Sequence, residues 1–309
     1  MGNYLYKRIW QLIPVMLGIS VLSFGLLQLM PGDPAEIMLR AEGTRPTPEA
    51  IAVMRRTLGL DQSLLAQYGH WLGRLIRLDL GLSLRTGRPV ATELLERLPA
   101  TAELAAYAII LALLAALPIG IGSALRPGGL LDRAGRIGSL LSVSMPAYGL
   151  GLLLLYYGSV KLRLFPVVGR DGLTAVLLPA LTLGCGLVGV YIRLLRASML
   201  AELDQLYIKA ARARGLSVWQ VIVGHALRNA ILPSLALLGV QIGGLLGGSV
   251  IVESIFSWPG VGMYAVEAIF AKDYLAIQGY VLMMAIIVVL VNLVVDALQL
   301  LLDPRLRTS

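Results

Sequence analysis

The chain alternates long apolar stretches with shorter polar ones, and this pattern predicts membrane-spanning helices. A hydrocarbon core of roughly 30 Å requires about 20 consecutive apolar residues in helical conformation. Windows of this length occur at 9–30, 100–124, 137–160, 173–195, 230–252 and 277–301. We therefore predict an all-α membrane protein with six transmembrane helices. Residues 1–98 comprise the first span and a long loop, and residues 99–309 form a five-helix core.

The polar stretches between the windows differ in length. Short loops are predicted at 125–136 and 161–172, and longer ones at 31–99, 196–229 and 253–276. In the longest loop, Thr47 followed by Pro48 is a helix-start signal. Apolar positions between Leu64 and Ile76 recur at helical spacing. We expect short amphipathic helices there, either on the outer membrane surface or over the mouth of a pore.

The basic residues predict the orientation of the chain. Thirteen of them lie near the spans on one side: Lys7, Arg8, Arg126, Arg133, Arg136, Arg193, Arg196, Lys209, Arg212, Arg214, Arg228, Arg305 and Arg307. Only four lie in the short loops on the other side: Lys161, Arg163, Arg170 and Lys272. Because Lys and Arg are enriched in short cytoplasmic loops, both termini and the 196–229 loop are predicted to be cytoplasmic.

Composition agrees with this assignment and excludes several functions. Hydrophobic residues make up 57% of the chain and charged residues 14%, against about 45–50% and 25% in soluble proteins. The net charge of +8 follows from membrane orientation, so no nucleic-acid partner is predicted. The chain has no phosphate-binding GxxxxGK[ST] motif, no HExxH motif and a single cysteine, Cys185. We therefore predict no catalytic residues, no metal site and no enzymatic activity.

The 196–229 loop has the most informative pattern. Leu203, Leu206, Tyr207, Ala210, Ala211 and Arg214 recur at helical spacing and predict one short amphipathic helix. Gly215 is placed to end it, and a second amphipathic piece follows at 218–228. This helix–glycine–helix elbow could dock in the groove of another protein or lie on anionic headgroups. Periodicity leaves both alternatives open.

Motifs along the whole chain resemble the binding-protein-dependent ABC importer permeases of the peptide/nickel branch. The run KAARARGLSVWQVIVGHALRNAILP, residues 209–233, is similar to the loop that carries the coupling helix of that family. Lys209 stands where the general importer motif begins with Glu. The other similar segments, in chain order, are PGDPAE, LGLDQSLLAQYGHWL, LDLGLS, LPATAEL, SMP and ESIFSWPGVG.

This resemblance implies a fold, partners and coupling residues. It implies a type I ABC importer fold in the bacterial inner membrane, with a second homologous permease subunit as heterodimer partner. Two ATP-binding subunits, which hold ATP and Mg, would lie inside, and a solute-binding protein outside. The chain itself would hold no cofactor. The residues implied in ATPase coupling are Tyr207, Lys209, Ala210, Ala211, Arg212, Arg214, Gly215 and His225.

Further candidate residues lie in and after the fifth span. Gln241, Ser249 and Asn292 could line a translocation path, because neutral polar groups bind cargo weakly enough to release it. Gln241 and Asn292 could instead hydrogen-bond between helices. Small residues on the fifth span permit close helix approach: Gly239, Gly243, Gly244, Gly247 and Gly248. An exterior turn with a tryptophan at the headgroups, near the external mouth by resemblance, is predicted for Trp258, Pro259, Gly260 and Gly262.

The resemblance also suggests a cargo. It is strongest to the nickel permeases, in PTPEAIAVMRRTLGLDQ and IVESIFSWPGVGMYAVEAIF, so we expect transport of nickel. Passage as a small chelate is expected, because naked Ni²⁺ would need several nitrogen or sulfur ligands. Dipeptides, oligopeptides or glutathione are the alternative. An ion-coupled secondary transporter is a rival class. It predicts inverted repeats and charged or broken helices at the midplane, whereas the spans of this chain contain few central charges and no obvious repeat.

Overall fold

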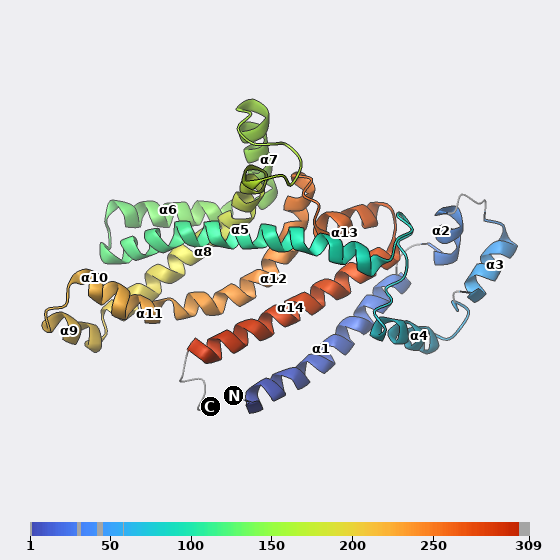
Figure 1. Ribbon diagram of the computed structural model, residues 1–309, viewed down its shortest axis with the longest axis horizontal. Coiled ribbons are helices and arrows are strands. Elements are labelled where there is room, and N and C mark those ends of the chain that lie inside the picture. The colour runs from blue at the N-terminus through green and yellow to red at the C-terminus, as the bar shows by residue number, and fades with distance from the viewer. Residues whose placement is uncertain (1, 30–31, 42–45, 58, 303–309) are drawn as a thin grey trace. The chain divides into compact units, whose positions relative to one another are not determined.

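The computed structural model describes residues 2–29, 32–41, 46–57 and 59–302, and every regular element in these ranges is a helix (Figure 1). Arg305 and Arg307, which support the predicted orientation, lie outside the described residues, as do Pro31 and Leu58 of the family motifs. The chain divides into two compact units. The amino-terminal unit is Asn3–Pro99 with Tyr264–Val289. The central unit comprises Ala100–Met263 together with Gly2 and the described residues from Leu290 onward.

The amino-terminal unit begins with helix α1 (Gly2–Leu29), followed by α2 (Pro34–Ala41), α3 (Pro48–Thr57) and α4 (Leu64–Ile76). The last three confirm the short helices predicted in the 31–99 loop. The Thr47 hydroxyl accepts a hydrogen bond from the Ala50 N–H at 3.2 Å, as the helix-start signal predicts. Proline opens both α2 and α3, because its fixed φ and missing N–H suit the first turn of a helix.

Helix α4 packs on α1 through aromatic side chains. The Phe24 ring lies 5.5 Å from the Tyr68 ring and 5.8 Å from the Trp71 ring, measured between centroids. The Ser20 and Tyr68 hydroxyls are hydrogen-bonded at 2.7 Å. Tyr68 and Trp71 are three positions apart and therefore share one face of α4. The predicted amphipathic face of this segment thus packs against the first apolar helix.

Long apolar helices follow in α5 (Val90–Leu125), α8 (Leu173–Leu203), α12 (Leu232–Ile255) and α14 (Tyr274–Leu302), with α13 (Val261–Phe270) between the last two. By length and composition, three described helices can cross a membrane, and up to five can if each bent helix pair counts as one span. The apolar stretch of α1 within the described residues, Ile13–Gly25, is shorter and is not counted among these candidate spans. The all-α membrane fold agrees with the prediction, and the count of six spans stays a prediction.

The third predicted span is broken. The sequence predicts a helix over 137–160, but α6 (Leu130–Ser144) and the following α7 (Ala147–Leu154) with the π-helical turn η1 (Leu155–Lys161) meet at 100°. Figure 1 shows α7 turning away from α6 within the central unit. The cause is Pro146, because a proline disfavours helical geometry at the residue before it. Met145 accordingly has extended backbone angles, φ −79° and ψ 121°.

The spans of the central unit pack around one hydrophobic cluster, which we call the span core. Small side chains of α5, including Ala108, Ala112 and Ala116, are fully buried in it. They let the helices approach closely: a Cβ at Gly184 of α8 would lie 2.7 Å from the carbonyl oxygen of Ala108. Of the glycines predicted to allow close approach on α12, Gly239 does so, because its Cβ would lie 2.8 Å from Cβ of Val295. Gly247 has open space.

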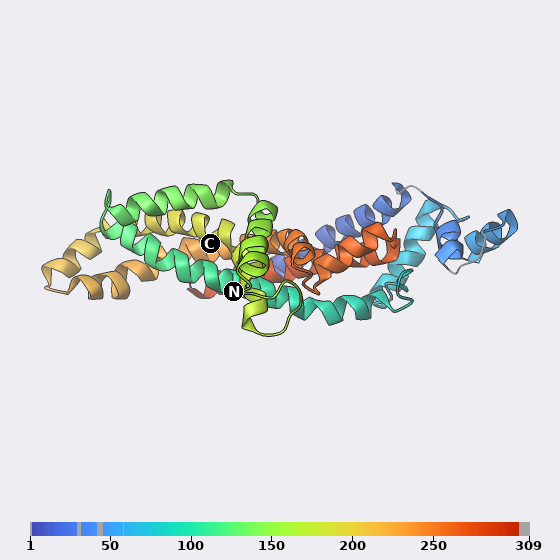
Figure 2. The ribbon, with the colours of Figure 1, turned by 90° about the horizontal axis from the view of Figure 1, so that it is seen from above.

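A second cluster, the elbow core, lies where α5 and α8 end. There the chain forms α9 (Leu206–Ala213), α10 (Val218–Val221), the π-helical turn η2 (Ile222–Ala226) and α11 (Leu227–Ala230). We call these four elements the elbow. Ile208, Val221 and Ala226 pack there against Ala124 of α5 and Met199 of α8. Figures 1 and 2 both place α9 and α10 at this end of the central unit.

Candidate functional site

Helix α9 begins later than the sequence predicts, and one of its two buried residues, Ile208, lies outside the predicted stripe. Helix α8 continues to Leu203 and ends at Asp204, so Leu203 does not belong to the short helix. The buried residues of α9 are Ile208 and Ala211, three positions apart. Leu206, which belongs to the predicted stripe, is 81% exposed. Of the predicted stripe, Ala211 is buried and Leu203 packs against the elbow core, whereas Leu206, Tyr207, Ala210 and Arg214 are exposed.

Gly215 ends α9 as the sequence predicts. Its φ of +81° lies in the left-handed region, which favours glycine. The Gly215 N–H donates to the Arg212 carbonyl at 3.0 Å, and the Leu216 N–H donates to the Ala211 carbonyl at 3.4 Å. This pair of bonds is a Schellman motif, and it reverses the chain between the two arms of the elbow.

The second arm of the elbow starts at a capping box. The Ser217 hydroxyl accepts a bond from the Gln220 N–H at 3.3 Å, and the Gln220 side chain accepts from the Ser217 N–H at 2.9 Å. Val218 and Trp219 follow and are each 70% exposed. His225 is also exposed, within the π-helical turn. Large apolar side chains are thus presented outward on both arms of the elbow.

Tyr207 ties the elbow to the preceding span. Its hydroxyl donates to the Glu202 carboxylate of α8 and accepts from the Asn229 side-chain amide of α11 at 3.0 Å. Burial, followed by the bond to Glu202, raises the pKa of Tyr207 above its usual value of 10. Lys209 forms an exposed ion pair with Asp204 at 2.9 Å.

The remaining predicted coupling residues present their side chains outward. Ala210, Arg212 and Arg214 are exposed. Neither arginine has an ion pair within the part of the chain that the structure describes. The outward face of the elbow therefore combines apolar side chains with unpaired positive charge, which suits a protein surface with an apolar groove and an acidic rim.

The turn after α12 is built differently from the predicted interfacial loop. Trp258 is only 1% exposed within the chain, and its indole N–H donates to the Ala100 carbonyl at 2.8 Å. It therefore belongs to the span core and does not anchor the chain at headgroups. The two glycines of this turn serve close packing, because a Cβ at Gly262 would lie 2.6 Å from Cα of Val250.

A buried carboxylate organises this turn, and the sequence analysis did not identify it. Glu253 has no exposed surface. Its Oε1 accepts from the Thr101 hydroxyl at 2.7 Å, and its Oε2 accepts from the Met263 N–H at 3.0 Å. Thr101 in turn accepts from the Val261 N–H at 2.9 Å. Together they cap the start of α13, where free N–H groups favour a negative charge. These bonds join the LPATAEL segment, which contains Thr101, to the ESIFSWPGVG segment, which contains Glu253 and Val261.

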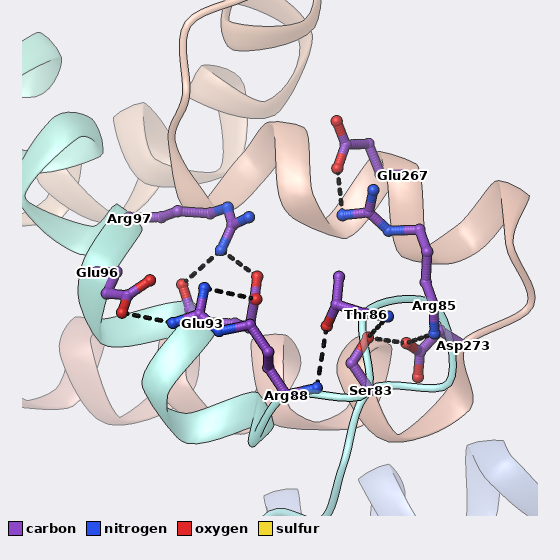
Figure 3. Close-up of polar contacts among 9 residues, drawn as sticks. All are labelled: Ser83, Arg85, Thr86, Arg88, Glu93, Glu96, Arg97, Glu267 and Asp273. Carbon is purple, nitrogen blue, oxygen red and sulfur yellow. Dashed lines mark hydrogen bonds and ion pairs between the residues drawn. The ribbon is translucent and has the colours of Figure 1, made fainter.

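A second polar cluster joins the LDLGLS segment to the junction of α13 and α14, within the amino-terminal unit (Figure 3). Asp273 is 1% exposed and caps α14 through the Ala276 N–H at 3.2 Å. Its other oxygen accepts from the Ser83 hydroxyl at 2.5 Å. Beside it, Arg85 forms an ion pair with Glu267 at 2.6 Å. These bonds fasten the loop that precedes α5 to the segment between α13 and α14.

Figure 3 also shows a charged group around Glu93, on the first turn of α5. The Glu93 side chain is 2% exposed and pairs with Arg88 at 3.0 Å and with Arg97. The Arg97 guanidinium lies 4.7 Å from the centre of the Tyr264 ring, a cation–π contact. The Arg88 side chain bonds to Glu96, and this bond raises the pKa of Arg88. The buried Glu93 carboxylate is therefore paired with two guanidinium groups, those of Arg88 and Arg97.

The three predicted path residues lie in different surroundings. Gln241 is half-buried, and Asn292 is exposed. Ser249 is fully buried, and its hydroxyl donates to the Leu246 carbonyl of its own helix at 2.8 Å. Of the three, Gln241 and Asn292 are therefore partly or fully accessible within the chain, and the role of all three in a path stays a prediction. No group of three or more His, Cys, Asp or Glu suited to a metal occurs among the described residues.

The long apolar helices are those of a membrane-spanning protein, and the elbow presents exposed apolar side chains beside them. Comparison with known families identifies it: residues 116–308 match the family described as binding-protein-dependent transport system inner membrane component, and residues 1–105 match its N-terminal region. The chain belongs to this family. It is a multi-pass inner-membrane permease subunit of an ABC importer and is not itself an ATPase, which confirms the predicted class. Such a system implies ATPase and binding-protein partners.

Full-length relatives are known. The chain is 39% identical to the glutathione transport system permease protein GsiC of Salmonella choleraesuis, over 99% of both chains. It is also 39% identical to the probable D,D-dipeptide transport system permease protein DdpB of Escherichia coli, over 98% of this chain and 97% of that protein. The expected nickel cargo receives no specific support from these relatives, whose names point to the peptide alternative.

A solved structure shares the fold. The MetNI methionine ABC transporter in an inward-facing conformation superposes with a TM-score of 0.58 and 17% sequence identity, over 68% of this chain and 96% of that chain. This similarity shows an ABC transporter permease fold.

Proposed function

We propose that this chain is a permease subunit of an importer for small peptides of the dipeptide or glutathione class. The observation that carries this proposal is the 39% identity to glutathione and D,D-dipeptide permeases along essentially the whole chain. The match covers 98–99% of the chain, so it includes the spans and the segments that would contact the cargo and its binding protein. Transport of nickel or of a nickel chelate is the alternative that the experiment below would detect.

In the proposed mechanism the elbow couples ATP hydrolysis to transport. The outward face of α9 and the exposed Trp219 would insert into a groove of an ATP-binding subunit. The Schellman turn at Gly215 and the link between Tyr207, Glu202 and Asn229 make the elbow stiff. A stiff elbow passes a displacement of the ATPase to α8 and α12 as a rigid movement, which alternates the spans between inward- and outward-facing states.

The proposed assembly contains two permease subunits, two ATP-binding subunits and a binding protein. Both termini and the elbow face the cytoplasm, where the ATPases are, as the distribution of Lys and Arg suggests. In this orientation the segment 253–276, which carries Trp258 and Asp273, lies on the outer side. The buried bonds of Glu253 and Asp273 hold the outer segments in place while the binding protein releases its cargo.

The experiment that tests the cargo uses the solute-binding protein of the same transport system and the reconstituted complex. Calorimetry measures binding of glutathione, of dipeptides, of D,D-dipeptides and of nickel with and without a small chelator. Uptake into proteoliposomes with ATP inside then measures transport of the solute that binds. We expect peptide binding and ATP-dependent peptide uptake. Binding and uptake of a nickel chelate alone would contradict the proposed cargo, and uptake driven by an ion gradient without ATP would contradict the class.

A further inference from the structure

Arginine side chains gather where the first turns of α6 meet α8, within the central unit. Helix α6 packs along α8 (Figure 2). Asp132 of α6 is 1% exposed, and its carboxylate accepts from the Arg196 guanidinium of α8 at 2.6 Å and 3.1 Å. The Gly128 N–H donates to the same carboxylate at 2.9 Å. This buried ion pair fixes the start of α6 against α8.

Three further arginines surround the buried ion pair. The Arg136 guanidinium lies 3.9 Å from the same carboxylate. Arg133, three positions earlier, shares a face of α6 with Arg136. On α8, Arg193 lies between Gly189 and Arg196, and both of these contact α6. We call Arg133, Arg136, Arg193 and Arg196 the arginine cluster.

The two helices turn their arginines to the same side. Gly135 of α6 and Ile192 of α8 both contact α5. Arg136 and Arg193 each follow by one position, which is a rotation of about 100° around the helix. Both arginines are exposed. They therefore flank the contact between α6 and α8 on the side that faces away from α5.

The arginine cluster carries more positive charge than the protein neutralises. Asp132 is the one acidic side chain that pairs with it within the described residues. Four arginines and one carboxylate leave three positive charges. The next acids along α8 have other partners, because Glu202 accepts from Tyr207 and Asp204 pairs with Lys209. Like charges this close repel one another unless an anion joins them, so the cluster suits an anionic ligand.

Exposed apolar side chains continue along α6 from the arginine cluster. Ile137 and Leu140 are each 62% exposed within the chain. They lie four positions after Arg133 and Arg136, and therefore on the same flank of the helix. A phosphate bound by the arginines has this apolar surface beside it. A phospholipid joins an anionic headgroup to acyl chains, whereas a free phosphate has no apolar part to cover that surface.

We propose that the arginine cluster binds the phosphate of an anionic phospholipid, whose acyl chains lie along Ile137 and Leu140 of α6. Guanidinium groups bind phosphate through paired N–H donors, and basic pockets between helices on the cytoplasmic side bind anionic headgroups. In the proposed orientation the cluster lies on that side. This lipid site goes beyond the proposed function and does not depend on which solute is carried.

The first test measures lipid retention. The purified importer complex is titrated in detergent with phosphatidylglycerol or with phosphatidylcholine of the same acyl chains, and native mass spectrometry measures the lipid that stays bound. We expect preferential retention of phosphatidylglycerol. The double variant Arg136→Gln, Arg193→Gln leaves the bond between Asp132 and Arg196 intact and should bind this lipid about tenfold more weakly.

Two further double variants separate charge from geometry. Arg212→Gln with Arg228→Gln removes the same charge from the elbow, where both arginines are exposed, and should leave lipid retention unchanged. Arg136→Lys with Arg193→Lys keeps the charge but loses the paired donors, so it should bind more tightly than the glutamine variant and more weakly than the wild type.

The second test locates the lipid. A phosphatidylglycerol with a photoreactive acyl chain is cross-linked to the complex, and mass spectrometry identifies the labelled peptide. We expect labelling at 137–141 of α6. Excess unlabelled phosphatidylglycerol should abolish it, whereas the same concentration of inorganic phosphate should not.

Several results would overturn the proposal. These are equal retention of the two lipids, equal binding by the two glutamine double variants, labelling only outside α6, and displacement by inorganic phosphate, which indicates a site for a free anion. A variant Arg136→Gln, Arg193→Gln that retains the lipid but loses the ATP-binding subunits would show that the arginine cluster contacts a protein instead. A complex that imports nickel and still retains phosphatidylglycerol on α6 contradicts only the proposed cargo.

Discussion

The Ser83 hydroxyl donates a 2.5 Å hydrogen bond to Oδ2 of Asp273, a residue 190 positions further along the chain. Both side chains are buried, at 2% and 1% exposure. The same hydroxyl accepts from the Thr86 N–H at 3.2 Å, so one serine orders the LDLGLS loop and fixes the carboxylate that caps α14. This bond directly links the loop before α5 to the segment before α14, and the Arg85 N–H donates to the same carboxylate oxygen at 3.3 Å.

Ser83→Ala should destabilise the amino-terminal unit, because it leaves the Asp273 carboxylate with one partner fewer. Hydrogen bonds to charged groups contribute roughly 1.5–3 kcal/mol, so we expect a loss of about 2 kcal/mol in the free energy of unfolding. Thermal unfolding of the purified complex measures it. Ser254→Ala is the control, since that exposed serine bonds only within its own helix. Equal effects of the two variants would show that the Asp273 bond contributes nothing.

Thr101→Val should remove capping hydrogen bonds from the first turn of α13 and so destabilise that turn. The substitution keeps the shape of the side chain but removes the hydroxyl that bonds to Glu253 and to the Val261 N–H. We expect a stability loss of about 2 kcal/mol. Hydrogen–deuterium exchange of the peptide that begins at Val261 should be faster, and Thr101→Ser should behave like the wild type. Unchanged exchange in Thr101→Val would contradict the capping role of the threonine.

Gly215→Val should weaken association with the ATP-binding subunits. A Cβ at Gly215 meets no atom within 4 Å, so the cost is the left-handed backbone alone. That conformation costs roughly 1–2 kcal/mol for an ordinary residue, which corresponds to about tenfold weaker association. Co-purification with the ATPases measures the loss.

Two control variants separate backbone strain from bulk at this turn. Gly215→Asn should be milder, because asparagine tolerates the left-handed region. Gly224→Ala places a side chain in open space elsewhere in the elbow, at a residue without a positive φ. It should leave association unchanged. If Gly215→Val assembles and transports normally, the elbow does not couple the ATPase.

Reporter fusions should place the 31–99 loop and the 196–229 loop on opposite sides of the membrane. A reporter fused after Ala66 in α4 should be located outside the cytoplasm. A reporter fused after Gln205, at the start of α9, should be located inside. The reason is the unequal distribution of Lys and Arg between the two sets of short loops. Activity of both reporters on one side would refute the predicted orientation.

Local signals in the sequence were sufficient where one residue determines the backbone. Thr47 with Pro48 predicted the start of α3, and Gly215 predicted the end of α9, because caps and positive φ angles depend on neighbours within four positions. Apolar periodicity likewise located the helix at 64–76, whose aromatic face packs on Phe24. The family resemblance added what periodicity could not, namely a partner for the elbow.

Tertiary contacts explain what the sequence analysis missed. Trp258 was predicted at headgroups because tryptophan is common there, but the Ala100 carbonyl and the span core give it a buried site. Ile208 was outside the predicted stripe, because periodicity identifies an apolar face without saying which neighbour it meets. Glu253 carried one usable signal: a carboxylate shortly before a glycine-rich turn and an apolar helix is placed to cap that helix.

The bonds of Ser83 and Thr101 also bear on the order in which the protein is made. Each hydroxyl is synthesised more than 150 residues before its carboxylate partner, Asp273 or Glu253. Chains emerge from the ribosome amino terminus first, so α5 must enter the membrane long before either bond can close. The Thr101 bond therefore forms only after residue 253 has been made, and the Ser83 bond only after residue 273. A nascent chain that ends before Glu253 would leave both hydroxyls without their carboxylate partners.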